Sequence, residues 1–189
     1  MIRKKVAPYT KVESLPRRFR KSADEHGYYG FLGRLRYAFR FTVNFYLNLL
    51  AICMPYSGLR VGLHKLRGVK IGKNVLIGFN VTIDNTYPNL ITIEDGASLA
   101  GNNLILAHSK PLEYHKSVLE SYVAPVVIKR NAWVTVGVIV LAGVTIGEGS
   151  VITANSVVAK DIPPNCLAAG NPAKVIKELH VAKGEAAQL

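Results

Sequence analysis

An aliphatic residue recurs at every sixth position in three runs after Lys70. The runs are Ile71, Ile77 and Ile83; Ile93, Leu99 and Ile105; and Ile128, Val134, Val140, Ile146, Ile152 and Val158. A second small or branched residue often stands four places later, as at Val75, Ala97 and Ser150. A period of six fits neither an α-helix nor an ordinary exposed strand. It indicates an all-β solenoid, in which each short flat face points an aliphatic side chain into a narrow core.

Two insertions interrupt this repeat. Four extra residues lie between Ile83 and Ile93, and seventeen lie between Ile105 and Ile128, where residues 110–125 form a predicted excursion loop. Loops that leave a rigid scaffold commonly carry binding and catalytic residues. We therefore expect the functional site beside these insertions.

The first 70 residues follow a different pattern. Residues 1–27 have scattered charges and little periodicity, which predicts a loose arm. From Phe31 to Leu49 the apolar residues recur at three- and four-residue steps, which is the period of an α-helix. The chain is therefore predicted to hold a basic arm and helical segment over residues 1–70, the solenoid over 71–165, and a tail with a short helix over 166–189.

The net charge of +12 belongs to the N-terminal segment. Residues 1–70 carry fifteen Lys and Arg against three acidic residues, whereas residues 71–189 carry nine of each sign. A basic, aromatic-rich helix followed by an apolar run could lie against an anionic membrane through residues 1–59. Alternatively, this helix packs on a neighbour or caps one end of the solenoid. Asn44, Asn48 and Pro55 interrupt the uncharged run, which argues against a transmembrane span.

The cysteines and the N-terminus bear on the compartment. Cys53 and Cys166 are too few and too far apart for a disulfide framework or a zinc knuckle, which fits a reducing compartment. The basic start, residues 3–5, leads into polar sequence and not into the apolar region of a signal peptide. A cytoplasmic location, or a peripheral one at the inner face of the cell membrane, is therefore expected.

Three stretches near the C-terminus carry a resemblance to a known family. They read GVTIGEGSVI at 143–152, NSVVAKDIPP at 155–164 and AGNPAKVI at 169–176. With them, residues 71–179 resemble the hexapeptide-repeat acyltransferases, in particular the maltose and galactoside O-acetyltransferase group and its polysaccharide O-acetyltransferase relatives. The resemblance implies a left-handed parallel β-helix and a homotrimer, with acetyl-coenzyme A bound between adjacent solenoids. It implies acetyl transfer to a hydroxyl of a sugar, a polysaccharide or a lipid-linked glycan.

The resemblance also implies a catalytic histidine at the start of the long excursion, which is His108 here. Transfer from a thioester to an alcohol requires removal of the hydroxyl proton, and imidazole, with a pKa near 6.5, suits that role at neutral pH. His115 lies within the excursion and is the rival, although a solvated loop residue is the better interpretation. Many relatives have Asp after the histidine, whereas this chain has Ser109.

The acceptor pocket is predicted near the first insertion. Asn80 and Asp84 match positions near the acceptor in the galactoside group, and we include the adjacent Asn85. Asn80 could donate to an oxyanion or hold a sugar hydroxyl, and Asp84 could accept from sugar hydroxyls. Asn and Asp also commonly form turns, which is the alternative for these positions.

For coenzyme A, the resemblance points to Trp133, to the backbone around Ala142 and Ala159, and to Lys160 and Lys174, which could meet the phosphates. Two residues depart from the family pattern by replacing its usual glycines, namely Thr135 and Asn155. Asn tolerates a left-handed backbone, whereas the branched Thr135 could narrow the groove. No metal is expected.

Two other function classes fit the sequence less well. A zinc enzyme of the γ-carbonic anhydrase type needs three converging histidines, and only His108 and His115 lie near the repeat. A non-enzymatic scaffold, or a nucleic-acid or membrane binder, would use the basic N-terminal arm. No stacking platform accompanies that charge, so no specific nucleic acid is expected.

Overall fold

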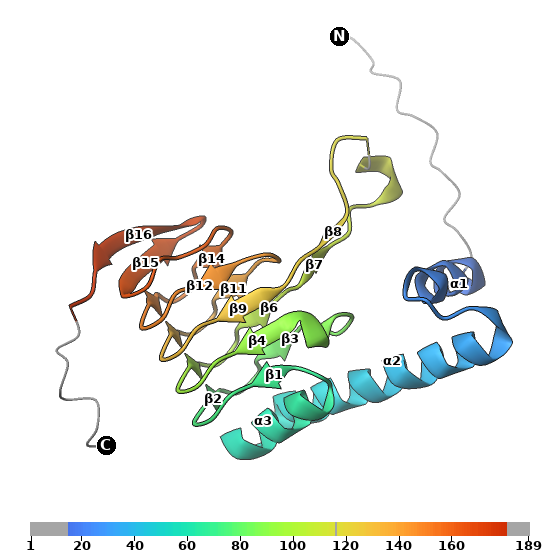
Figure 1. The fold of residues 1–189 in the computed structure, drawn as a ribbon, viewed down its shortest axis with the longest axis horizontal. Coiled ribbons are helices and arrows are strands. Elements are labelled where there is room, and N and C mark those ends of the chain that lie inside the picture. Colours follow the sequence, from blue (N-terminus) through green and yellow to red (C-terminus); the bar gives the residue numbers. More distant parts are fainter. Residues whose placement is uncertain (1–14, 116, 181–189) are drawn as a thin grey trace, which may run out of the picture. The chain divides into compact units, whose positions relative to one another are not determined.

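The structure, a computed structural model, describes residues 15–115 and 117–180 and divides the chain into two compact units, residues 1–43 and 44–189 (Figure 1). Three helices come first: α1 at Leu15–Glu25, α2 at Gly30–Cys53 and α3 at Ser57–Leu66. In the two described ranges, no helix is long and apolar enough to cross a bilayer. The helix predicted from Phe31 onward is confirmed as α2.

The first unit is built around Tyr37 of α2. Its side chain is buried, and its ring centroid lies 5.6 Å from that of Phe19 on α1 and 5.5 Å from that of Tyr28. The loose arm predicted over residues 1–27 is therefore wrong where α1 forms, and residues 1–14 lie outside the described part. A short helix alone is marginal in water, so its packing on α2, with Ala23 fully buried, is what stabilises it.

The second unit is dominated by three sheets, in each of which every third strand of the repeat pairs in parallel (Figure 1). The first sheet contains β1 (Lys70–Ile71), β4 (Ile91–Ile93), β9 (Val126–Ile128) and β12 (Thr145–Ile146). The second contains β2 (Leu76–Ile77), β5 (Ser98–Leu99), β10 (Trp133–Val134), β13 (Val151–Ile152), β15 (Cys166–Gly170) and β16 (Ala173–Glu178). The third contains β3 (Thr82–Ile83), β6 (Leu104–Ile105), β11 (Ile139–Val140) and β14 (Val157–Val158). The chain therefore winds through the three sheets in turn, as the six-residue period predicts.

The predicted core is confirmed. Of the twelve repeat positions, eleven are buried and Ile71, in the first coil, is partly exposed. Repeat positions pair with one another from coil to coil, as in the series Ile77, Leu99, Val134 and Ile152. Each apolar side chain is thus covered by its equivalents in the neighbouring coils.

Asparagine makes many of the corners between the sheets. Six asparagines have a positive φ, including Asn80 at 54° and Asn155 at 58°. Asn80 also donates from Nδ2 to Oδ1 of Asn102 in the next coil, at 2.8 Å. Asparagine tolerates this left-handed conformation better than most residues. Asn155 therefore adopts the left-handed backbone of its position without a glycine.

The C-terminal end of the described chain differs from the prediction. A short helix was expected within residues 166–189, but β15 continues the second sheet and β16 folds back on it in antiparallel orientation. Gly170, with φ of 105°, begins the reversal, and Val175 and Ile176 favour the extended conformation that follows. Residues 181–189 lie outside the described part.

Helix α3 covers the open edge of the first coil. The Ile77 amide donates to the Ser57 hydroxyl at 3.0 Å, and the Ile77 carbonyl accepts from Nε of Arg60 at 2.7 Å. Arg67, directly after α3, donates from Nη2 to the Ile83 carbonyl at 2.9 Å. Side chains therefore bond backbone groups that a further strand would otherwise pair. The end-capping alternative concerns residues 31–59, whereas the cap on the first coil comes from residues 57–67, after most of that segment.

Candidate active site

His108 begins the long excursion. It opens β7 (His108–Ser109), which pairs in antiparallel orientation with β8 (Tyr122–Val123) at the base of the loop (Figure 1). The preceding carbonyl, of Ala107, accepts from the Ala124 amide at 3.0 Å. The side chain of His108 is 30% exposed, so its backbone is fixed by the sheet while its ring remains accessible to solvent.

Asp84 holds the imidazole of His108. Nδ1 of His108 lies 2.6 Å from Oδ2 of Asp84, whose side chain is fully buried. The same carboxylate accepts from the amides of Ala107, Thr86 and Tyr87 at 2.7–3.0 Å. Burial alone would raise the pKa of Asp84. The amides of Tyr87 and Ala107, the His108 side chain and the Thr86 amide outweigh burial and lower this pKa below its usual value.

This geometry sets the tautomer of the imidazole. Because the Asp84 carboxylate is ionised and only accepts, Nδ1 of His108 must donate to it. In the neutral ring, Nε2 therefore carries a lone pair and can accept a proton. The Tyr87 ring meets the imidazole edge to face, with 5.5 Å between centroids. The Asp84–His108 hydrogen bond thus fixes the ring with Nε2 as its proton acceptor, the arrangement that a general base would need.

The strand register shows which predicted residues lie along the same corner. Ile83, Ile105, Val140 and Val158 pair in order across the third sheet. The residues that follow them therefore line one edge of the solenoid, namely Asp84, Asn85, His108, Ala142, Ala159 and Lys160. The carboxylate predicted to meet a sugar hydroxyl is instead bonded by the chain itself.

The other predicted residues lie elsewhere. Asn80 is one corner earlier, between β2 and β3, and Trp133 and Lys174 belong to strands β10 and β16 of the second sheet. Asn85 is held from behind, since its side-chain oxygen accepts from Arg67 at 3.2 Å. Asn80, Trp133 and Lys174 are thus not on the corner that carries His108.

Two residues left open by the sequence have defined surroundings. His115 is exposed in the short 3₁₀ helix Glu113–His115, with its ring 5.1 Å from that of Tyr114. Thr135 directs its hydroxyl to the Ile152 carbonyl of the next coil, at 2.6 Å. The side chain of Thr135 therefore bonds within its own solenoid.

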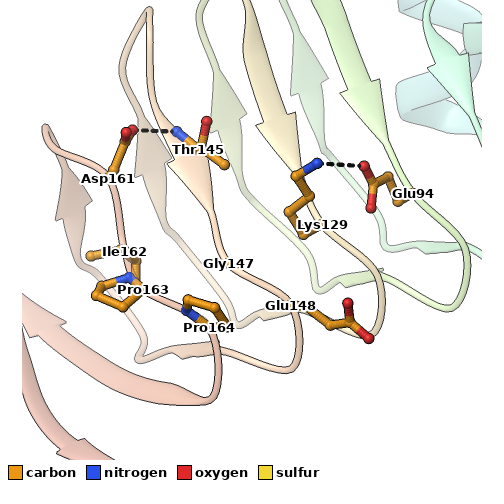
Figure 2. Close-up of a pocket in the computed structure, with 9 residues that line it drawn as sticks. All are labelled: Glu94, Lys129, Thr145, Gly147, Glu148, Asp161, Ile162, Pro163 and Pro164. Atoms are coloured by element: carbon orange, nitrogen blue, oxygen red, sulfur yellow. Dashed lines mark hydrogen bonds and ion pairs between the residues drawn. The ribbon is translucent and has the colours of Figure 1, made fainter.

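A pocket of about 490 Å³ lies elsewhere on the solenoid, and Figure 2 draws the residues that line it. Its lining includes the ion pair of Lys129 and Glu94, 2.9 Å apart, together with Asp161, Pro163 and Pro164. His108 is not among its lining residues. In residues 15–115 and 117–180, no three histidine, cysteine or acidic side chains are grouped to hold a metal ion.

Sequence reasoning missed the pairing of Asp84 with His108, although the repeat contained a signal for it. Asp84 directly follows the core position Ile83, and His108 comes three residues after the equivalent core position Ile105 in the next coil. The four-residue insertion lies between these two positions and hides their equivalence. Counting coils instead of residues would have placed the two side chains at one corner.

Comparisons with known proteins find acetyltransferases that are similar in sequence and in fold. No family model matches the chain. The galactoside O-acetyltransferase of Escherichia coli K12 is 40% identical over 113 residues, which are 59% of this chain and 55% of that protein. The chain spans about half the length of the curated relatives it matches.

Two solved structures are similar over more of the chain. A maltose O-acetyltransferase from Clostridium difficile 630 is 28% identical with a TM-score of 0.60, over 76% of this chain and 88% of that one. A galactoside acetyltransferase in complex with coenzyme A is 29% identical with a TM-score of 0.56, over 91% of this chain and 86% of that one. In repeat and in fold, the chain is thus similar to the hexapeptide-repeat acetyltransferases of the galactoside and maltose O-acetyltransferase group, as its sequence predicts.

Proposed function

We propose that the chain is an O-acetyltransferase that moves the acetyl group of acetyl-coenzyme A to a hydroxyl of a sugar or glycan. The observation that carries the proposal is the 2.6 Å contact between His108 and a fully buried Asp84. Likeness to a galactoside acetyltransferase in complex with coenzyme A supplies the class of donor and acceptor. The proposal includes the left-handed winding of the solenoid that the resemblance implies, and a crystal structure would show the hand directly.

The proposed reaction needs one base and no covalent enzyme intermediate. Nε2 of His108 takes the proton of the acceptor hydroxyl as its oxygen attacks the thioester carbonyl carbon. The tetrahedral intermediate collapses with cleavage of the carbon–sulfur bond, and Nε2 returns the proton to the leaving thiolate. Asp84 stabilises the imidazolium that exists between the two transfers, as a buried carboxylate does in hydrolase triads.

We place the donor between two copies of the chain. Ala142, Ala159 and Lys160 lie on the corner of His108, whereas Trp133 and Lys174 lie on the second sheet. Lys160 and Lys174 are exposed and can meet phosphates, and the Trp133 side chain is half exposed. The homotrimer that the family resemblance implies is part of the proposal, with the two sets of residues meeting across the interface of two copies.

A membrane surface is the proposed partner of the first unit. Phe31, Leu32, Leu35 and Phe39 of α2 are all more than half exposed. Between residues 15 and 43 the chain has seven Arg and Lys against two acidic residues. Exposed apolar side chains beside basic ones fit an interface of anionic lipid, where a lipid-linked glycan would be found. Co-sedimentation with anionic vesicles tests this contact.

The first experiment is a titration with acetyl-coenzyme A, followed by assays of thiol release with a panel of sugars. We expect His108→Ala to lower transfer by a factor on the order of 10² to 10⁴ and to leave acetyl-coenzyme A binding unchanged, because the ring acts on the acceptor proton. His115→Ala is the control and should keep full activity. Near-normal turnover of His108→Ala would remove this residue from the mechanism. Failure of the folded protein to bind acetyl-coenzyme A would favour the scaffold alternative.

A further inference from the structure

Arg67 is a buried cation directly behind the corner that carries Asp84. It follows α3, and its side chain is only 5% exposed. Burial lowers the pKa of Arg67 to about 10, while the charge of Asp84 acts in the opposite direction. A guanidinium in such a place requires partners for all of its N–H groups.

One side of the guanidinium holds the end of β3. Nη2 donates to the carbonyls of Ile83 and Asp84, at 2.9 Å each, and reaches Oδ1 of Asn85 at 3.2 Å. Three consecutive residues are therefore bonded to one nitrogen. The middle residue is Asp84, whose carboxylate holds the imidazole of His108.

The other side of the guanidinium is bound by neutral groups. Nε donates to Asn44 at 2.8 Å, and Nη1 lies 2.7 Å from Oδ1 of Asn48 and 2.8 Å from Nδ1 of His64. His64 is kept neutral, because burial and then the charge of Arg67 lower its pKa to about 3. The groups bonded to Arg67 in the described part of the chain are therefore uncharged. Its positive charge is left to act on nearby Asp84.

We propose that Arg67 is a positioning residue for the base: it fixes residues 83–85 so that the Asp84 carboxylate holds Nδ1 of His108. The inference rests on the proposed function for its catalytic meaning, and on the contacts above for its structural meaning. Arg67 acts through Asp84 and has no role in contacting the substrate. Its removal frees the corner to move and withdraws a charge that favours the ionised carboxylate.

Arg60 provides a matched control. It lies seven residues earlier on α3, is also 5% exposed, and donates from Nε to the Ile77 carbonyl at 2.7 Å. Its guanidinium also donates to the Met54 carbonyl and lies 4.4 Å from the centroid of the Phe79 ring. Arg60 thus caps the same coil at β2 and makes none of the contacts to residues 83–85. Replacing it reports the cost of losing a buried capping arginine alone.

The first test reads the tautomer of His108 and needs no enzymatic activity. In ¹⁵N-histidine NMR spectra at a pH where imidazole is neutral, about 8, the wild type and Arg60→Met should show His108 protonated at Nδ1. His108→Gln assigns the signal. Arg67→Met should show a mixture of both tautomers. An unchanged His108 signal in Arg67→Met would overturn the proposal.

The second test separates turnover from donor binding. Arg67→Met should lower kcat by a factor on the order of 10 to 100, while KM for acetyl-coenzyme A stays within about twofold of wild type. Arg60→Met should keep kcat when rates are corrected for the folded fraction. Arg67→Lys, which retains the charge but not the planar fork, should fall between the two. Equal kcat values for Arg60→Met and Arg67→Met would also overturn the proposal.

The two tests distinguish this proposal from the proposed function. Suppose that the wild type transfers acetyl to no acceptor, while the His108 tautomer differs between the wild type and Arg67→Met. The proposed function is then wrong and the positioning role stands. If Arg67→Met does not fold, Arg67→Lys is judged by the same spectrum. If His108 in Arg67→Lys then has the same tautomer as in the wild type, this would count against a positioning role for the planar guanidinium of Arg67.

Discussion

At the scale of single residues, two histidines of this chain have opposite surroundings. His108 is partly exposed and bonded to a buried carboxylate, which leaves Nε2 able to take a proton. His64 is fully buried and accepts a hydrogen bond from Arg67, which leaves it neutral. Among the described residues, Nε2 of His64 has no hydrogen-bond partner. The neighbour at Nδ1, an anion for His108 and a cation for His64, thus separates the proposed base from a buried hydrogen-bond acceptor.

The pKa of His64 leads to a prediction about stability and pH. Because the pKa is lowered to about 3 by folding, the unfolded chain binds this proton more readily. The contribution of neutral His64 is present above the ordinary histidine pKa near 6.5 and is lost as pH falls toward 3. As the pH falls from 7 to 5, we expect the titration of this residue to lower the free energy of unfolding by about 2 kcal/mol.

His64→Asn tests this prediction, since an amide oxygen can accept from Arg67 in place of Nδ1 and does not titrate. Denaturant unfolding at the two pH values should show a smaller loss of stability in the variant than in the wild type. Asp84, whose pKa is lowered, contributes only below about pH 4 and does not enter this window. Parallel pH dependence of the two proteins would contradict the buried neutral state of His64.

At the scale of elements, α2 has different surroundings in its two parts. Asn44 and Asn48 bond Arg67, and Ala51 is buried, so the later turns pack within the second unit. In the first unit, Tyr37 is buried, whereas Phe31 is 81% exposed and Phe39 is 71% exposed. Single exposed apolar residues are common, but several of them on one stretch of a helix beside basic residues favour an interaction surface. The two alternatives for residues 31–59 therefore concern different parts of α2. Its later turns pack within the second unit, and its first turns carry the side chains of the proposed membrane contact.

The membrane contact predicts binding to vesicles that contain phosphatidylglycerol and weaker binding to pure phosphatidylcholine vesicles. Phe31→Ser combined with Phe39→Ser should reduce co-sedimentation, because both side chains would enter the interface. Arg36→Gln combined with Arg40→Gln should reduce it most at low salt, since the attraction of basic residues is screened by ions. Leu76→Ser and Leu66→Ser, at exposed positions of the second unit, are controls. Equal sedimentation with both lipids would contradict the electrostatic part, and none at low salt would contradict the whole contact.

At the scale of the whole molecule, the residues proposed to contact the donor lie on two different sheets of the solenoid. Lys160 follows β14 of the third sheet, and Lys174 lies on β16 of the second. We predict a trimer of about 62 kDa, three times the 20.6 kDa of one chain, by light scattering. Lys160→Ala and Lys174→Ala should each weaken acetyl-coenzyme A binding.

Mixed trimers provide the decisive comparison. Refolding or co-expressing Lys160→Ala with Lys174→Ala chains should restore tight binding at those interfaces where two intact lysines meet. Neither variant alone contains such an interface. A monomer in solution, or mixed assemblies that bind no better than either variant, would contradict a donor site shared between copies.

The sequence by itself determined the solenoid and its core. Ile77, Leu99 and Val134 recur at a fixed step because every face of a coil buries one side chain, so a local pattern carries the fold. The same pattern marked the insertion beside His108. Burial at periodic positions can be predicted because it depends on spacing along the chain and not on any particular partner.

Only the tertiary structure decided the partners of the polar residues. Asp84 reaches His108 across one coil, and Arg67 reaches Asp84 from a helix outside the repeat. Helix α1 forms on Tyr37, and residues 173–178 of the predicted tail form β16 by pairing with β15. Hydrogen bonds and ion pairs are directional and short, so an insertion of a few residues or a turn of a helix decides which groups meet. Residue type alone therefore predicts which side chains could take part in chemistry, and the tertiary structure determines which of them are in contact.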